Sequence, residues 1–162
     1  MMTAIKKNNT SGFSLMELMV VIAIIGITSA IAIPNLIGWL PDYRLRSATR
    51  DAVSFLLEAK MRAVSENADV VIIFDASAGS FISFIDVNED GLFANDGTEP
   101  VVRQGTMPVG INILASKTFG YDDRGISTGG STDSVELGNA KGNTGKITVN
   151  IPGNIRVEMT YL

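Results

Sequence analysis

The sequence predicts an α+β fold, in which a long N-terminal helix is packed on a C-terminal antiparallel β-sandwich-like head. Three observations support this prediction. Residues 18–41 carry no charged side chain, residues 42–66 repeat apolar side chains at helical spacing, and 13 of the 16 glycines follow residue 67. Glycines scattered among short runs of β-forming residues are typical of strands joined by tight turns, and not of βαβ units.

The uncharged segment Leu18–Pro41 is 24 residues long, and about 20 residues are enough to span a bilayer. We expect a helix here, because backbone groups in lipid must form their hydrogen bonds internally. Pro34 removes one helical donor and clashes with the preceding turn, so a kink or local melting is expected at this position. Lys6 and Lys7 precede the segment, which places the leader in the cytoplasm and the head on the other side of the membrane.

The segment Asp42–Glu66 is predicted to continue this helix as an amphipathic stretch. If the helix runs unbroken from Phe13 to Glu66, it is about 80 Å long at 1.5 Å per residue. Apolar side chains recur at steps of three and four, which favours one buried helical face. These positions are Leu45, Ala48, Ala52, Phe55, Leu56, Ala59 and Ala63.

The remainder of the chain is predicted to form strands and turns. The clearest signal is the alternation of apolar and polar residues on both sides of Pro152–Asn154, which indicates a hairpin. The glycine-rich segments 129–131 and 138–145 are expected to be mobile loops. The predicted strands are Val70–Phe74, Phe81–Ile85, Val109–Leu114, Ile147–Ile151 and Ile155–Met159.

The composition excludes several classes of function. The chain has no cysteine and no histidine, so it lacks disulfides, thiol nucleophiles and Ser-His-Asp catalysis. Asp122, Asp123 and Arg124 lie in a glycine-flanked segment and are expected to form a solvated turn. We therefore expect a structural protein with no cofactor, and not an enzyme. From residue 67 onward there are twelve acidic and six basic residues, so nucleic acid is not an expected partner.

An acidic motif at residues 86–91 matches the first half of a calcium-binding loop. Asp86, Asn88 and Asp90 stand at alternate positions and a glycine follows, which is the pattern that such loops use. The second half departs from the motif, because Gly97 occupies the place of the bidentate glutamate and Glu99 has the wrong offset. We favour an acidic β-turn in which the side chains bond their own backbone, with the calcium site as the weaker alternative.

Glu17 is an acidic residue at the start of the apolar segment. A carboxylate at membrane depth costs free energy, so its presence suggests a functional role. The natural partner of such a carboxylate is a cation. If the chain were cut after Gly12, the new amino group of Phe13 would lie four residues away. We hypothesise that Glu17 pairs with this amine, in its own subunit or in a neighbouring copy.

The segment Gly12–Pro34 resembles the class III signal of type IV pilins and pseudopilins. The resemblance implies that prepilin peptidase cleaves after Gly12 and methylates the new N-terminal residue, Phe13. It also implies that Glu17 assists assembly and that Pro34 accompanies a weakened stretch of helix. The expected organisation is a leader (1–12), a transmembrane and filament-core helix (13–41), its amphipathic continuation (42–66) and a β-rich head (67–162).

More narrowly, the chain is similar to GspH/FimT-type minor pilins, whose second hairpin carries an acidic stretch such as residues 86–91. This resemblance implies a minor subunit of a helical filament that is assembled at the inner membrane. The expected machine is the type II secretion pseudopilus, which exports folded proteins. The alternative is a type IV pilus, with a role in pilus biogenesis, adhesion or DNA uptake.

The same resemblance implies the partners and the location. The partners are prepilin peptidase, other pilin or pseudopilin subunits, the inner-membrane assembly platform and membrane lipid. The expected location is the bacterial inner membrane, with one span and a periplasmic head, and then a periplasmic or surface filament. Some FimT-like pilins bind DNA through a Gly-Arg-x-Arg stretch, but the corresponding residues Gly153–Arg156 lack one of the two arginines.

Two other interpretations of the N-terminus remain open. One is an ordinary secretory signal, with Ala30 and Ala32 as the small residues of its cleavage site. The other is an uncleaved signal anchor on a periplasmic binding protein that never polymerises. Both explain the apolar segment, but neither explains the offset of Glu17 from Gly12 and Phe13.

Overall fold

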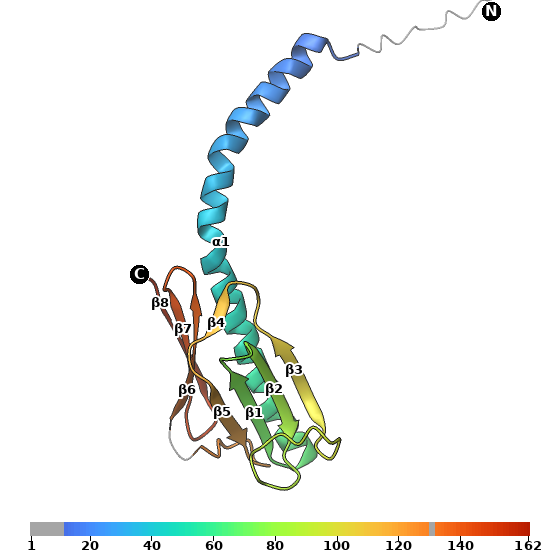
Figure 1. The fold of residues 1–162 in the computed structure, drawn as a ribbon, viewed down its shortest axis with the longest axis vertical. Helices are drawn as coiled ribbons and strands as arrows, with labels where there is room; N and C mark the ends of the chain where they lie inside the picture. Colours follow the sequence, from blue (N-terminus) through green and yellow to red (C-terminus); the bar gives the residue numbers. More distant parts are fainter. Residues whose placement is uncertain (1–11, 130–131) are drawn as a thin grey trace, which may run out of the picture. The chain divides into compact units, whose positions relative to one another are not determined.

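The computed structural model describes residues 12–129 and 132–162, which form one long helix and eight strands (Figure 1). Lys6, Lys7 and the leader apart from Gly12 lie outside the described residues. Contacts divide the chain into two units, Met1–Trp39 and Leu40–Leu162. The elements are α1 (Leu15–Glu66), β1 (Val70–Asp75), β2 (Ser80–Ile85), β3 (Val101–Thr106), β4 (Ile111–Ile113), β5 (Lys117–Tyr121), β6 (Asp133–Asn139), β7 (Thr144–Val149) and β8 (Ile155–Thr160).

The N-terminal unit contains the first part of α1, which begins directly after a capping residue. The backbone N–H of Glu17 donates to the Ser14 hydroxyl over 3.2 Å, and the N–H of Leu18 donates to the Ser14 carbonyl over 3.2 Å. A serine at this position satisfies one of the free N–H groups of the first helical turn. The backbone is helical through Pro34, so the predicted local melting is absent from the subunit, whereas a kink remains a prediction.

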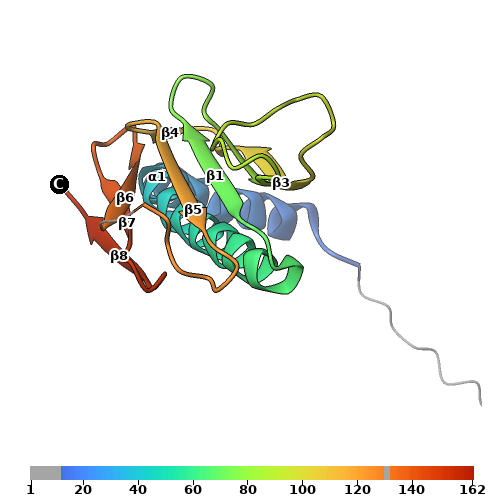
Figure 2. The ribbon, with the colours of Figure 1, turned by 90° about the horizontal axis from the view of Figure 1, so that it is seen from below.

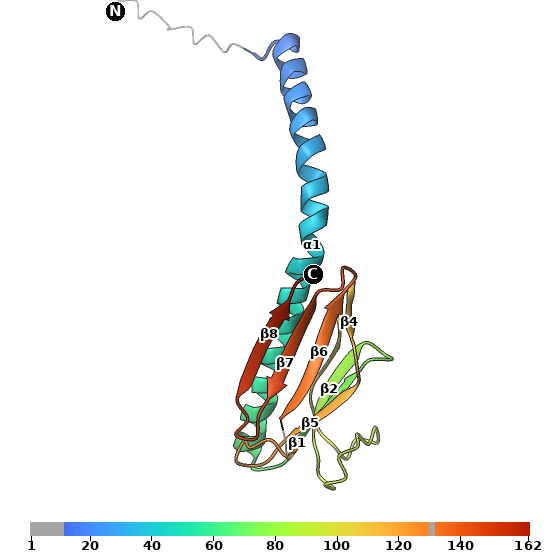
Figure 3. The ribbon, with the colours of Figure 1, turned by 90° about the vertical axis from the view of Figure 1, so that its left-hand side faces the viewer.

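The second unit contains two four-stranded antiparallel sheets, which confirms the predicted fold class. One sheet has the order β3-β2-β1-β5 and the other β4-β6-β7-β8. Figure 2 shows the helical part of this unit lying against the sheet that contains β1 and β5. Figure 3 shows β4, β6, β7 and β8 side by side.

The part of α1 within this unit contributes one face to the common core. All seven apolar positions predicted for this face are buried, and Thr49 lies with them. They join residues of both sheets in one hydrophobic cluster. At its centre the Phe55 ring lies 5.8 Å from that of Phe74 in an edge-on arrangement and 4.6 Å from that of Phe81. Aromatic pairs at these separations add to the stabilisation from burial alone.

The helix ends at Glu66 because the next residue adopts a left-handed conformation. Asn67 has a φ of 53°, and the N–H of Ala68 donates to the carbonyl of Ala63 over 3.2 Å. This pairing is the long hydrogen bond of a Schellman cap. Asparagine tolerates the left-handed region better than most residues, so the change from helix to strand is encoded locally.

The structure confirms the predicted hairpin and corrects one predicted loop. β7 and β8 pair with Val149 opposite Ile155, and Gly153 N–H closes the turn on the Asn150 carbonyl over 2.7 Å. In the segment expected to be a mobile loop, Gly138 lies in β6 and Gly145 lies in β7. Only residues 140–143 form the turn between these strands. Of the other expected loop, 129–131, the last two residues lie outside the described residues.

The reason for glycine at position 145 is the close approach of the helix. A Cβ atom at this position would lie 2.5 Å from Oγ1 of Thr49. No side chain fits at that separation, so glycine allows α1 to pack directly on β7. Glycine inside a strand generally weakens it, and here the close contact with the helix outweighs that cost.

Candidate functional site

The first candidate site is the junction between residues 12 and 13. Gly12 and Phe13 precede α1 and lie outside regular secondary structure. Phe13 is 82% exposed. The peptide bond between them is therefore in open, non-helical backbone, the state in which proteases act most readily.

Glu17 lies in the first turn of α1, four residues after Phe13. Its position three residues after the capping Ser14 matches the spacing of a capping box, and a negative charge in the first turn complements the helix dipole. The residue is exposed, and the structure records no ion pair for it among residues 12–129 and 132–162. Any cationic partner of this carboxylate therefore lies outside the recorded ion pairs.

The apolar surface that follows Glu17 is continuous and uncovered. The large apolar side chains of residues 18–40 are exposed. By length and composition α1 contains a candidate membrane span, an 18-residue window of which no part is buried in the structure. A core helix of a soluble protein would be buried. Exposed apolar surface of this extent indicates a membrane or a protein partner.

The predicted acidic turn is present between β2 and β3. Asn88 Oδ1 accepts the N–H of Asp90 over 3.2 Å, and Asn88 Nδ2 donates to Asp90 Oδ2 over 3.0 Å. Asp90 Oδ1 accepts the N–H of Leu92 over 2.7 Å. These side chains bond their own loop, as expected for a turn rich in Asp and Asn.

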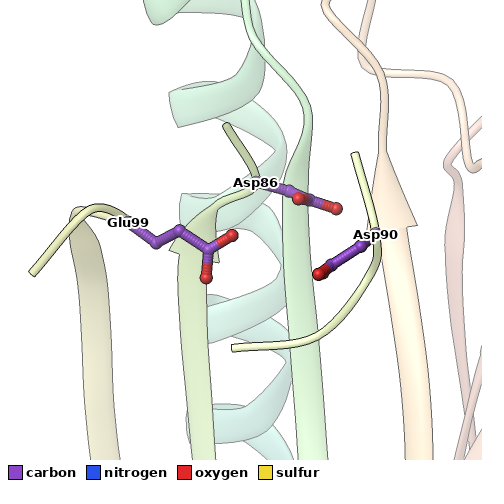
Figure 4. Close-up of side chains that lie close together, drawn as sticks. All are labelled: Asp86, Asp90 and Glu99. Atoms are coloured by element: carbon purple, nitrogen blue, oxygen red, sulfur yellow. The ribbon is translucent and has the colours of Figure 1, made fainter. Parts of the chain in front are cut away.

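The structure also brings a third carboxylate to this turn. Asp86, Asp90 and Glu99 each place a carboxylate oxygen within 4.8 Å of the other two, and Figure 4 shows the three side chains facing one another. Asn88 lies beside this group through its hydrogen bond to Asp90. The offset of Glu99 along the chain does not match the calcium-loop motif. The loop nevertheless folds back before β3 and brings Glu99 close to Asp86. Spacing in sequence carries no signal for that return.

The remaining charged candidates are solvated surface residues. Arg124 is exposed and pairs with Asp122 over 2.7 Å within a turn closed by Gly125 N–H on the Asp122 carbonyl. Arg156 is exposed on β8 and pairs with Glu158 over 3.2 Å. Each arginine is thus engaged by a neighbouring carboxylate.

Two family models match the chain. A prokaryotic N-terminal methylation motif covers residues 7–33. The model described as type II transport protein GspH covers residues 48–153, which is more than half of the chain. A search of curated proteins with this sequence finds no match.

Solved structures with the same fold come from two kinds of machine. The minor pseudopilin EpsH of the Vibrio cholerae type 2 secretion system is 13% identical, with a TM-score of 0.53 over 72% of this chain and 97% of that chain. The type IV minor pilin FimU of Pseudomonas aeruginosa is 15% identical, with a TM-score of 0.56 over 72% of this chain and 90% of that chain. A second crystal form of FimU gives 14% identity, a TM-score of 0.54, and 70% and 92% coverage.

The family match and the fold agree with the N-terminal features. Proteins of this family are structural pilin or pseudopilin subunits and not enzymes. Their assembly with other subunits and their processing by prepilin peptidase are implied by the family and by the methylation motif. With its exposed apolar helix and two-sheet head, the chain belongs to the GspH family of minor pseudopilins and minor pilins.

Proposed function

We propose that this chain is a minor pseudopilin of a type II secretion system, incorporated into a short filament that exports folded proteins. The observation that carries the proposal is the match to the family described as type II transport protein GspH. In the same chain, the methylation motif leads into an apolar helix that the rest of the structure leaves exposed. Such a helix requires burial in lipid before assembly and among other subunits after it.

Maturation is the first step of the proposed function. Prepilin peptidase removes residues 1–12 and methylates the amino group of Phe13. The exposed, non-helical backbone at Gly12 and Phe13 supports cleavage at this bond. Residues 13–41 then anchor the subunit in the inner membrane, residues 42–66 continue the helix, and residues 67–162 form a periplasmic head.

Assembly is the second step, and we assign it to Glu17. Its carboxylate is close to the N-terminus and has no ion pair among the described contacts. A lone carboxylate in an apolar environment is strongly disfavoured, whereas one that meets an amine is compensated. Pairing with the amino group of Phe13 in an adjacent subunit would fix the axial register as the assembly platform adds subunits to the filament.

The second candidate function is that of a minor pilin in a type IV pilus. The fold likeness to FimU favours it, since the two chains share the architecture over most of their length. Within this alternative, pilus biogenesis or adhesion suits the head better than DNA uptake. The head has twice as many acidic as basic residues after residue 67, and Arg156 is paired with Glu158.

The deciding experiment has two stages. Mass spectrometry of the N-terminal peptide from the membrane fraction is expected to give a peptide that begins at Phe13 with one added methyl group. Deletion of the gene is then expected to stop secretion of exoproteins while surface pili remain. Lost pili with intact secretion would favour the type IV pilus, and a peptide that begins at Ile33 would overturn both functions.

A further inference from the structure

The group formed by Asp86, Asp90 and Glu99, here called the acidic cluster, has the dimensions of a cation site. One oxygen from each carboxylate lies within 4.8 Å of the others. Oxygen ligands bind Ca²⁺ at about 2.3–2.6 Å, so two ligands of one ion lie no more than about 5 Å apart. The three carboxylates are therefore close enough together to share a single ion.

Two members of the cluster are buried and have only one oxygen engaged. Asp86 is 7% exposed and Glu99 is 3% exposed. Asp86 Oδ2 accepts the N–H of Gly91 over 2.8 Å, and Glu99 Oε2 accepts the N–H of Ala94 over 2.7 Å. The other oxygens, Asp86 Oδ1 and Glu99 Oε1, are buried and accept no hydrogen bond from the described residues. Buried carboxylates normally pair with a cationic group or coordinate a metal.

Within the part of the chain that the structure describes, no ion pair offsets the charge of the cluster. None of the ion pairs recorded for residues 12–129 and 132–162 includes Asp86, Asp90 or Glu99. Negative charge extends beyond the cluster to Asp69, whose pKa is raised by burial and further by nearby carboxylates. Three carboxylates with oxygens within 4.8 Å of one another repel each other in a partly buried site, and a divalent cation offsets that repulsion.

The loop that carries the cluster is fixed at several points. The two backbone contacts described above anchor its turns, and the Phe93 ring lies 5.1 Å from that of the buried Phe84. Glu89 and Gly91 adopt positive φ angles of 59° and 71°, which turn the chain so that Asp90 faces Asp86. The carboxylates are thus held together by the fold of the loop, whereas free side chains with the same charge would move apart.

We propose that Asp86, Asp90 and Glu99 bind one calcium ion, which links the two ends of the loop between β2 and β3. The cluster supplies carboxylate oxygens, and hard cations prefer such ligands. Calcium is favoured over magnesium because it accepts irregular geometry and more ligands. Asp90 is exposed, so water can complete the coordination from that side. This site is independent of the filament function proposed above.

The test is calcium binding by the purified full-length chain in detergent. After EGTA treatment, millimolar CaCl₂ is expected to raise the unfolding temperature by several degrees, and excess EGTA is expected to reverse the rise. Titration calorimetry is expected to give one site, with a Kd on the order of 10⁻⁴ to 10⁻³ M, the range of extracellular calcium modules. Magnesium at the same concentration is expected to produce a smaller rise.

Two variants and a matched control locate the site. Glu99→Gln and Asp90→Asn each remove one anionic ligand and are expected to weaken calcium binding at least about tenfold. Asp96→Asn makes the same change of charge in the same loop, at a residue that bonds Thr98 and lies outside the cluster. It is expected to bind calcium like the unmodified chain. Asp90 is exposed, so the Asp90→Asn variant decides the question if Glu99→Gln does not fold.

The proposal is overturned if calcium neither binds nor changes the unfolding temperature of the unmodified chain. It is also overturned if Asp90→Asn retains full affinity, or if Asp96→Asn loses affinity to the same extent as the cluster variants. A magnesium response equal to or larger than the calcium response would overturn the choice of calcium.

Discussion

Asn143 donates a hydrogen bond of 2.6 Å from its side-chain amide to Oδ1 of Asp42, which joins the β6–β7 turn to α1. The same oxygen accepts a second amide hydrogen bond from Asn139 over 3.0 Å, and Oδ2 forms an ion pair of 2.9 Å with Lys141. Two residues of this turn and the last residue of β6 therefore converge on a single carboxylate. The turn was expected to be mobile, and these contacts to Asp42 explain why it is instead defined by the fold.

This arrangement predicts a stability that depends on acid pH. The hydrogen bond and charge of Lys141, with the two asparagine amides, lower the pKa of Asp42 below its ordinary value of 3.8. The folded protein therefore binds fewer protons than the unfolded chain as this group titrates, and Asp42 contributes stability above about pH 4. That contribution is lost as the pH falls through the lowered pKa of the folded state.

The variant Asp42→Asn is expected to unfold at a lower temperature than the unmodified chain at pH 7. The difference is expected to shrink below pH 4, because protonation then removes the same charge from the unmodified chain. Thermal unfolding of both detergent-solubilised chains, at pH 7 and below pH 4, measures this difference in unfolding temperature. Asp51→Asn, at an exposed residue of the same helix, is the control. An equal deficit at both pH values would show that Asp42 acts only through its shape.

The burial of Phe55 predicts that truncating its side chain causes a large loss of stability. Phe55 is buried between rings of β1 and β2, so Phe55→Ala leaves a cavity between α1 and the sheet. Changes of this kind cost about 3–5 kcal/mol of the free energy of unfolding. Leu57→Ala, at an exposed residue of the same helix, is expected to cost well under half as much. Urea unfolding of both variants checks the contrast, and similar costs would refute the assigned buried face.

The contact between Gly145 and Thr49 predicts a coupled pair. Gly145→Ala introduces a Cβ atom 2.5 Å from Oγ1 of Thr49 and is expected to cost about 1–3 kcal/mol through overpacking. Threonine is branched at Cβ and cannot turn both of its γ atoms away. The double variant Thr49→Ala/Gly145→Ala is therefore expected to recover part of the loss. A double-mutant cycle measures the coupling, and strictly additive costs would contradict this explanation.

The sequence predicted those parts of the fold that depend on local periodicity. The seven buried apolar residues of α1 follow helical periodicity, and the β7–β8 hairpin alternates around a Pro-Gly-Asn turn. It did not predict β3, β5 or β6. The first lies at a sheet edge and is mostly exposed, and the other two contain glycines at positions where neighbouring side chains approach closely. Such contacts are set by partners that are distant in sequence.

The candidate sites also differ in whether they depend on local sequence spacing or on contacts between residues distant in sequence. The roles proposed for Gly12, Phe13 and Glu17 depend on fixed offsets in one short segment, so sequence spacing was sufficient to single these residues out. The acidic cluster depends on the return of Glu99 to Asp86 across a loop, and this return follows from the pairing of β2 with β3. Offsets taken from helix-flanked calcium loops could not locate it, because strands flank this loop.

Glu17 provides the prediction that tests the assembly step. Glu17→Gln keeps the size and hydrogen-bonding capacity of the side chain but removes the charge that we pair with the amine of Phe13. Filament fractions are expected to contain at least about tenfold less of this variant, since a neutral side chain cannot compensate a buried amine. Cleavage after Gly12 should continue, because the bond lies outside α1. The control is Ser14→Ala, which removes the helix cap and leaves the charge in place. If Glu17→Gln enters filaments as well as this control does, charge pairing is not what holds the subunit in register.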